Sequence, residues 1–236
     1  EWIEAWAKVR LCARTTFGYM TLGVLDNRDS FTFNLVHLLE PHFDSVVVRR
    51  CDAPDALTAL HDVDALVLSP GPGLPRESGA LMDVLAAHID RTPILGVCLG
   101  MQALAEFTGG TLQHTGAPRH GIARNVHWTG TDPLHRGLSA EMAVGWYHSW
   151  VVNARTLPSV WRVLATDHEG HVAAMRHELR AEQVEKRPHP LELRSRSGGV
   201  GTQTLNAELG RSFSSLAMAS TMRCATPRSV PPKRSA

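Results

Sequence analysis

Short apolar runs that alternate with helix-like segments constrain the fold of this chain most strongly. Strands are predicted at residues 21–25, 45–49, 65–69 and 93–97, with helices at residues 30–39, 54–61, 76–89 and 98–107. Continuous apolar strands that alternate with helices form parallel sheets whose two faces are both covered. We therefore expect an α/β fold with a central, mostly parallel sheet, helices on both faces and a flavodoxin-like layering.

The sequence changes character twice after this region. Strand-like runs are predicted at residues 111–114, 124–128, 143–152, 161–165 and 171–175. Beyond His177 the periodicity fades, and the sequence is rich in Ser, Gly, Pro and Arg, as linkers and tails are. We expect an N-terminal extension at residues 1–20, a domain at residues 21–178 and a disordered or aberrant basic tail at residues 179–236.

Composition argues against several kinds of site. The four cysteines are scattered and none forms a CxxC pair, which disfavours a disulfide framework or a structural zinc site and favours a reducing, cytoplasmic setting. No run of 18 apolar residues occurs, so no membrane-spanning helix is predicted. We expect no metal and no organic cofactor.

The formal net charge of +1 hides an asymmetry between the domain and the tail. Residues 179–236 hold ten Lys and Arg but four Asp and Glu, so they carry +6 and residues 1–178 carry −5. A basic tail can bind nucleic acid, but such blocks are more often solvated. Only Phe213 interleaves the arginines, and the glycine-rich stretch at residues 197–205 lacks the Lys-Ser/Thr pair of a phosphate loop. We expect no nucleic-acid partner.

Cys98 stands at a cramped corner in the stretch ILGVCLGMQAL, residues 94–104. Gly96 and Gly100 flank it in the G-x-nucleophile-x-G pattern, with cysteine in place of serine. A strand that turns sharply into a helix strains the nucleophile's backbone, and glycines on both sides avoid clashes. We interpret Cys98 as the nucleophile of an elbow, with its sulfur exposed on the bend. A buried structural cysteine is the alternative.

The helix predicted after Cys98 would assist such a nucleophile. Its unpaired N–H groups and its dipole favour a thiolate, which lowers a pKa that is ~8.5 in an isolated cysteine. The Leu99 N–H can also face an oxyanion that forms at the attacked carbon.

Three further stretches accompany this corner along the chain. They read LDNRDSFTFNLVHLL at residues 25–39, LVLSPGPGLPRESG at residues 66–79 and VGWYHSWVV at residues 144–152. Together with ILGVCLGMQAL they resemble the class I, triad-type glutamine amidotransferases over roughly residues 21–178. The likeness is greatest to the small subunits of chorismate-aminating enzymes, anthranilate synthase component II and its aminodeoxychorismate synthase counterpart.

The resemblance implies roles for residues at the elbow and at the PGPG turn. Cys98 would attack the side-chain amide of L-glutamine, forming a γ-glutamyl thioester and releasing ammonia. Gly71, Pro72 and Gly73 would contact glutamine, and the N–H groups of Gly73 and Leu99 would form the oxyanion hole. Pro72 cannot serve there, because it has no N–H.

Two more parts of the chain would hold glutamine in such an enzyme. Gln102 follows Cys98 by one helical turn, although a solvent-facing helix residue is the plainer reading from the sequence alone. Ser149 and Trp150 would hold the backbone ends of glutamine through main-chain groups, and Trp150 stands where the family usually has Leu. His148 reads as an ordinary strand histidine, and we do not assign it as the base.

The segment after the first predicted strand is assigned a structural role and not a catalytic one. Asp26, Asn27 and Asp29 could suggest metal ligands, but Asx residues that cap a helix explain them better. We expect Asp29 or Ser30 to be the N-cap and the segment to be structural or interfacial.

The catalytic histidine and glutamate of the family are missing where the resemblance places them. In the family a Gly-Val-Gln-Phe-His-Pro-Glu-Ser stretch supplies the base and its orienting carboxylate, but residues 179–199 read LRAEQVEKRPHPLELRSRSGG. His189 and Glu192 echo the motif with one residue too many, which in a strand would turn Glu192 to the opposite face. The abrupt change after residue 178 suggests, as a hypothesis, an altered reading frame.

We interpret the chain as a glutamine amidotransferase subunit that supplies ammonia to a chorismate-binding synthase subunit in a hetero-oligomer. The product would be anthranilate, for tryptophan, or aminodeoxychorismate, for folate, with a slight lean to the latter from DNRDSFTFNLVHLL. The alternative is a catalytically impaired or inactive homologue that acts only as a binding partner, because the His-Pro-Glu motif is missing.

Overall fold

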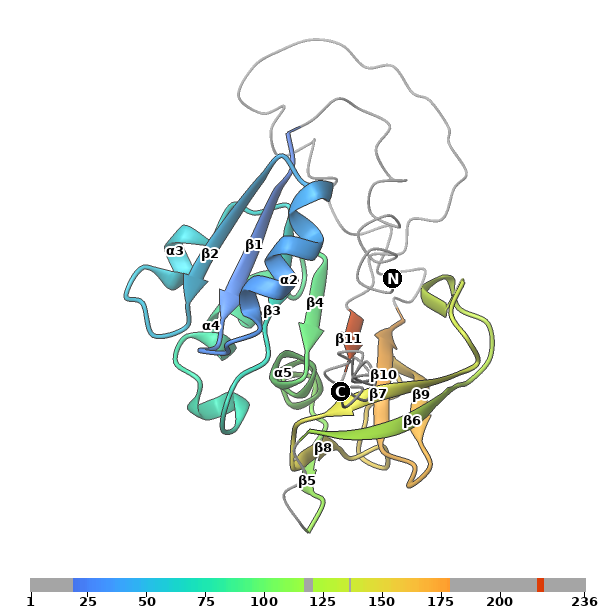
Figure 1. The fold of residues 1–236 in the computed structure, drawn as a ribbon. Coiled ribbons are helices and arrows are strands. Elements are labelled where there is room, and N and C mark those ends of the chain that lie inside the picture. The colour runs from blue at the N-terminus through green and yellow to red at the C-terminus, as the bar shows by residue number, and fades with distance from the viewer. Residues whose placement is uncertain (1–18, 117–120, 136, 179–215, 219–236) are drawn as a thin grey trace, which may run out of the picture.

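A nine-stranded sheet organises the protein in the computed structural model, which describes residues 19–116, 121–135, 137–178 and 216–218 (Figure 1). The strand order is β2-β1-β3-β4-β11-β10-β9-β6-β7. The first five strands in this order run parallel: β2 (Ser45–Arg50), β1 (Thr21–Asp26), β3 (Ala65–Leu68), β4 (Ile94–Val97) and β11 (Leu216–Met218). The sheet thus contains the parallel region expected from the apolar runs.

The remaining strands form an antiparallel extension of the same sheet. They are β10 (Val172–His177), β9 (Trp161–Asp167), β6 (Ile122–Trp128) and β7 (Glu141–Trp146). A separate two-stranded sheet pairs β5 (Leu112–His114) with β8 (Trp150–Val152). β8 follows β7 after a turn of three residues, so the chain passes directly from the large sheet into the small one.

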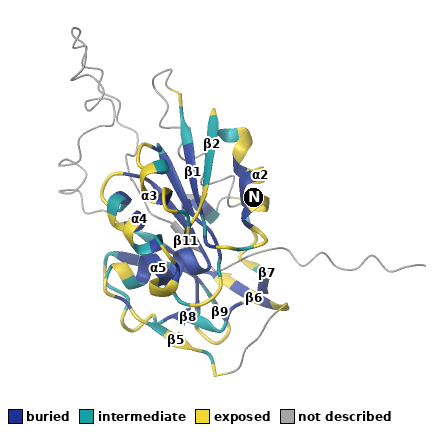
Figure 2. Cartoon of the chain, turned by 90° about the vertical axis from the view of Figure 1, so that its left-hand side faces the viewer, coloured by how far each residue is buried: buried dark blue, intermediate teal, exposed yellow. Residues whose placement is uncertain are grey.

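Helices cover both faces of the parallel region (Figure 2). They are α2 (Thr32–Leu39), α3 (Ala56–Ala59), α4 (Leu81–His88) and α5 (Leu99–Phe107), with 3-10 turns η1 (Glu40–His42), η2 (Pro75–Glu77) and η3 (Pro133–His135). Alternate strand residues point to opposite faces. Val24 and Val67 therefore pack with α2, whereas Leu25 and Leu66 pack with α3, α4 and α5. This arrangement confirms the expected fold class.

Two predicted helices are shorter than the sequence suggested. The segment predicted at residues 76–89 divides into η2 and α4, because Gly79 adopts a φ of +52° between them. A Cβ at Gly79 would lie 2.3 Å from the Cys51 carbonyl oxygen, so the chain needs glycine at this point. The helix predicted at residues 54–61 is confined to α3.

The strand predicted at residues 143–152 is two strands in different sheets. β7 ends at Trp146 and β8 begins at Trp150, with Tyr147, His148 and Ser149 in the turn. This turn contains neither glycine nor proline, so an apolar run that passes through it resembles one strand.

β11 was not expected from the sequence. Its three residues belong to the predicted basic tail, yet they pair in parallel with β4 and antiparallel with β10. Within the described parts of residues 1–236, no helix is long and apolar enough to cross a membrane.

Candidate active site

Cys98 lies at a sharp turn between β4 and α5, as the glycine pattern predicted. Its φ of 52° and ψ of −103° are rarely adopted by a residue with a side chain. A Cβ at Gly96 would lie 2.5 Å from the Gly100 carbonyl carbon, and one at Gly100 would lie 2.3 Å from the Leu68 carbonyl oxygen. Both glycines are therefore required for strand and helix to approach each other, and the elbow is confirmed.

The expectation that the Cys98 sulfur is exposed on the bend is wrong. Cys98 is 7% exposed, is not in a disulfide, and belongs to the apolar cluster that contains Val97 and the α2 face. The reason is the close packing of the corner, since the same glycines that permit the turn bring α5 against β3. A ligand must therefore enter a tightly packed corner.

The PGPG loop lies against this corner. A Cβ at Gly71 would lie 2.6 Å from the Asn27 carbonyl oxygen and 2.8 Å from Leu99 Cδ2, so the Gly71 backbone packs beside the first residue of α5. Gly73 is exposed with a φ of +76°, and Pro72 is exposed as well. The structure thus brings the loop and Leu99 together, and the oxyanion hole from Gly73 and Leu99 stays a prediction.

Hydrogen bonds connect the loop after β1 to Ser69, the residue just before the PGPG loop. The Asn27 backbone N–H donates to Ser69 Oγ over 2.8 Å, and Asn27 Nδ2 donates to the Ser69 carbonyl oxygen over 2.8 Å. Asp26 Oδ1 accepts from the Asp29 N–H and from Thr32 Oγ1. These bonds favour the structural interpretation of the segment. Asp26 Oδ1 and Asp29 Oδ1 accept from the chain's own N–H and O–H groups, and we assign no metal to the segment.

The predicted N-cap of α2 is wrong in detail. The residue before α2 is Phe31, and no side chain caps the helix. Asp29 Oδ1 accepts instead from the Phe31 N–H over 2.8 Å, which makes an Asx turn ahead of the helix. Ser30 is not at the cap.

Gln102 and Trp150 meet at one oxygen atom. Gln102 is 3% exposed, which contradicts the solvent-facing reading, and its Nε2 donates to the Trp150 carbonyl oxygen over 2.8 Å. The Ser149 carbonyl oxygen accepts from the backbone N–H of Thr115 over 2.8 Å and from Thr115 Oγ1 over 3.1 Å. Gln102, Ser149 and Trp150 thus lie together, and the carbonyl oxygens of Ser149 and Trp150 already accept hydrogen bonds from the protein itself.

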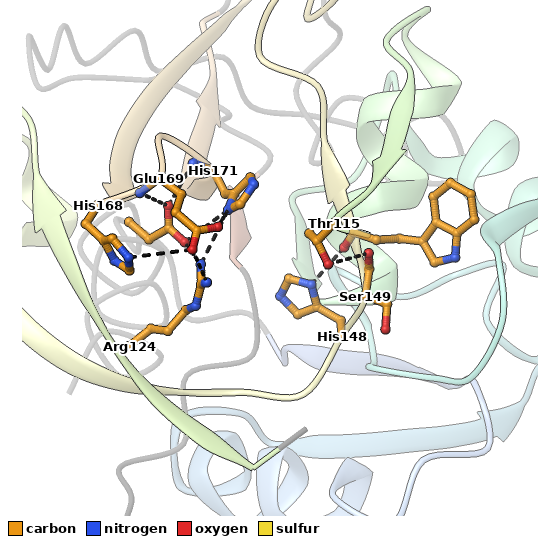
Figure 3. Close-up of polar contacts among 9 residues, drawn as sticks. Thr115, Arg124, His148, Ser149, His168, Glu169 and His171 are labelled. Atoms are coloured by element: carbon orange, nitrogen blue, oxygen red, sulfur yellow. Dashed lines mark hydrogen bonds and ion pairs between the residues drawn. The ribbon is translucent and has the colours of Figure 1, made fainter. Parts of the chain in front are cut away.

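His148 also contributes to this contact. It is buried, and its Nδ1 lies 2.7 Å from the Trp150 carbonyl oxygen. Its ring packs on Trp146 with 4.2 Å between centroids. Figure 3 shows His148 beside Thr115 and Ser149.

A buried ion-pair cluster behind Trp146 was missed by sequence reasoning. Arg124 bonds Asp167 through Nη1 and Glu169 through Nη2, the latter over 2.6 Å (Figure 3). The Arg124 guanidinium lies 4.8 Å from the Trp146 ring centroid. A signal existed, because Arg124 shares the buried alternation of β6 with Val126. The partners could not be inferred, since Asp167 lies 43 residues away.

The surroundings of Asp167 favour its charged form. Burial raises the pKa of Asp167, but the backbone and side-chain hydrogen bonds from His171 and the charges of His171 and Arg124 outweigh it, so the pKa is lowered overall. Asp167, Glu169 and His171 also lie close enough to share a cation. Arg124 already supplies positive charge to both carboxylates, and we assign no metal to them.

The general base cannot be placed from the described residues. β11 runs parallel to β4 with Met218 opposite Val97, so the carboxyl end of β11 points to the elbow. The candidate dyad of His189 and Glu192 lies outside the described residues.

This chain is similar in sequence to proteins of a known family. A family model described as glutamine amidotransferase class-I matches residues 23–184. An aminodeoxychorismate synthase component 2 from Escherichia coli is 39% identical over 159 residues, covering 65% of this chain and 82% of the relative. A pyocyanine-specific anthranilate synthase component 2 from Pseudomonas aeruginosa is 40% identical over 160 residues, covering 66% and 78%.

A solved structure extends the comparison to the fold. A glutamine amidotransferase from Thermotoga maritima matches with a TM-score of 0.51 and 15% identity, covering 67% of this chain and 71% of that one. At this identity the match supports the fold alone.

Proposed function

Because the chain belongs to the class I glutamine amidotransferase family, we propose that it hydrolyses glutamine at Cys98 and supplies the ammonia to a chorismate-aminating synthase subunit. The observation that carries the proposal is the strained backbone of Cys98 at the start of α5. Strain of this kind persists at functional sites because the surroundings enforce it. A merely structural cysteine would not need it.

The proposed reaction proceeds through a thioester. The Cys98 sulfur attacks the side-chain carbonyl carbon of glutamine, the C–N bond breaks, and ammonia leaves after the nitrogen gains a proton. Water then hydrolyses the γ-glutamyl thioester to glutamate and restores the thiol. The N–H groups of Leu99 and Gly73 stabilise the oxyanion, and the amino end of α5 favours the thiolate.

Glutamine binding is assigned to the surroundings of the elbow. Gly71, Pro72 and Gly73 contact the substrate amide from the loop that packs on Leu99. The Gln102 side chain and the backbone of Ser149 and Trp150 hold its amino-acid end. The hydrogen bond from Gln102 to Trp150 supports this assignment, because it joins the two groups in one contact.

The partner is proposed from the names of the relatives. Those relatives are component 2 proteins of anthranilate and aminodeoxychorismate synthases. We propose a hetero-oligomer with a component 1 subunit that binds chorismate. We place it in the cytoplasm, where Cys98 stays reduced.

The sequence favours a second candidate function. No His-Pro-Glu stretch follows residue 178, and after His189 the chain has no further histidine. Loss of a triad histidine costs ~10⁶-fold in rate in a serine protease, although a cysteine retains some thiolate without a partner. The chain could then bind the synthase subunit, and even glutamine, without useful turnover.

One experiment separates the two candidates. Full-length protein, alone and with a component 1 subunit, is assayed for glutamate formation and for glutamine-dependent amination of chorismate, with Cys98→Ser as the control. The first candidate predicts turnover that Cys98→Ser reduces at least ~10³-fold. Complex formation with selective labelling of Cys98 by a glutamine-analogue electrophile, but without turnover, supports the second. Absence of both labelling and turnover contradicts the glutaminase assignment.

A further inference from the structure

We propose that His148 is a positioning residue for glutamine: its imidazole fixes the Trp150 peptide group that faces Gln102. This inference rests on the proposed function, because it assigns a task to a residue of the same site. No role in the reaction was expected for His148 from the sequence.

The hydrogen bond defines the state of the ring. His148 Nδ1 lies 2.7 Å from the carbonyl oxygen of Trp150, two residues along the chain. A carbonyl oxygen only accepts, so Nδ1 carries the proton and donates. With 7% of the residue exposed, water competes little for this bond.

The strand register determines which groups of Trp150 remain for a ligand. His114 faces Trp150 in the β5–β8 pair, while the Thr115 N–H donates to the Ser149 carbonyl oxygen. This is the pattern of a non-hydrogen-bonded antiparallel pair, so the N–H and the C=O of Trp150 both point away from β5. They point to the edge that Gln102 approaches, and the N–H there can bind a carboxylate.

Two donors converge on the same carbonyl oxygen. Gln102 Nε2 approaches it over 2.8 Å from α5, and His148 approaches from the turn. Since α5 begins directly after Cys98, this shared oxygen connects the Trp150 peptide to the helix that carries the nucleophile. Loss of the His148 bond leaves Gln102 as the remaining one of these two side-chain donors to the Trp150 oxygen.

Packing behind the ring limits its rotation. Trp146 is fully buried and lies 4.2 Å from the His148 ring, and the Arg124 guanidinium lies over the Trp146 ring. Asp167 and Glu169 hold Arg124 in turn. The imidazole therefore rests against a stack that begins in β6 and reaches the turn between β9 and β10.

Two substitutions isolate the hydrogen bond. His148→Leu removes the donor, whereas His148→Asn keeps an N–H close to the position of Nδ1. His88→Leu is the matched control, because His88 is likewise a buried histidine but lies in α4 and bonds Thr92. Thermal unfolding first identifies the folded variants, and His148→Asn keeps the test open should His148→Leu fail to fold.

Hydrogen exchange of residues 147–152, measured without ligand, is the first readout. His148→Leu should exchange about threefold to tenfold faster there, the effect of losing one hydrogen bond, and His148→Asn should stay near the wild type. Equal exchange in all three proteins would overturn the positioning role, whether or not glutamine binds. Faster exchange in His88→Leu at residues 147–152 would show a general loosening instead.

Labelling of Cys98 is the second readout. The rate with a glutamine-analogue electrophile is divided by the rate with iodoacetamide, which has no amino-acid group. The proposal expects this ratio to fall about tenfold in His148→Leu and to recover in His148→Asn, whereas a purely structural role would lower both rates together. No selectivity in the wild type would contradict the proposed function, and the exchange data would still decide the role of His148.

Discussion

The parallel and antiparallel regions of the large sheet are stabilised in different ways. Around β1, β3 and β4 the interior is apolar, and the critical contacts are backbone on backbone, as at Gly96 and Gly100. Around β6, β9 and β10 the interior includes charged groups, with Arg124 against Asp167 in one cluster. The proposed site lies where the parallel region, with Cys98, meets the turn that leads from β7 of the antiparallel region into β8.

The difference indicates which substitutions each region tolerates. A backbone contact fails when an atom is added, because backbone groups cannot move aside cheaply. A buried ion pair fails when one partner is removed, because the other charge remains without compensation. The turn at Cys98 therefore depends on the lack of side chains at Gly96 and Gly100. The turn after Trp146 depends instead on side chains that are present, among them Arg124.

Arg124→Met should have the largest effect on stability. It leaves Asp167 buried without the charge of Arg124, and we expect the free energy of unfolding to fall by about 3–5 kcal/mol. Urea denaturation followed by tryptophan fluorescence measures the change. Arg49→Met is the matched control, because Arg49 pairs with Asp55 on the surface and should cost less than about 1 kcal/mol. Equal losses in both variants would remove the distinction between the two regions.

Gly100→Ala tests the parallel region. Alanine normally stabilises a helix position by about 0.5–1 kcal/mol over glycine. At Gly100 the new Cβ would meet the Leu68 carbonyl oxygen at 2.3 Å, so we expect a loss of about 3 kcal/mol. Gly116→Ala is the control for an unhindered site, since nothing lies within 4 Å of its Cβ position and only its φ of +86° opposes the change. A stabilising Gly100→Ala would refute the contact.

The third and smallest expected effect on stability is the pH dependence caused by His88. This residue is a titratable group inside the otherwise apolar parallel region. Burial, with the nearby charge of Arg91, lowers the pKa of His88 from 6.5 to about 4. Its stabilising contribution is complete above pH 6.5 and is lost as the pH falls toward 4, since only the unfolded state binds the proton there. Between pH 7 and pH 5 we expect a loss of about 2 kcal/mol.

His88→Leu isolates this part of the pH dependence. Denaturation curves at several pH values between 4.5 and 7.5 should show a shallower slope for the variant than for the wild type. The slope of stability against pH is compared, and not stability itself, because the altered packing in the variant shifts stability by the same amount at every pH. Parallel profiles would show that His88 takes up its proton in the folded state as readily as in the unfolded one.

The parallel region was predictable because its signals are local. The apolar run before Cys98 and the glycines on both sides lie within seven residues, and β4, the turn and α5 follow from them. The strained φ of Cys98 was implied for the same reason, since only a forced turn explains glycine at both Gly96 and Gly100. The burial of the sulfur was not implied, because it results from contacts with β3 and α2.

The antiparallel region was harder to predict because its contacts are distant in sequence. The turn at Tyr147, His148 and Ser149 lacks a glycine or proline, so the run through it was read as one strand. Gln102 meets Trp150 across 48 residues, and a helix pattern alone does not show its burial. The resemblance to the family identified these residues as candidates, and the structure shows which of them are in contact.

The position of β11 has a consequence for folding during synthesis. Among the described residues, β4 and β10 are joined in the large sheet through residues 216–218, which come some forty positions after β10 ends. Until residues 216–218 are made, a new chain presents two open edges, one of them on β4 next to Cys98. Open edges invite pairing with other chains, so premature termination before residue 216 should produce aggregation as well as loss of activity.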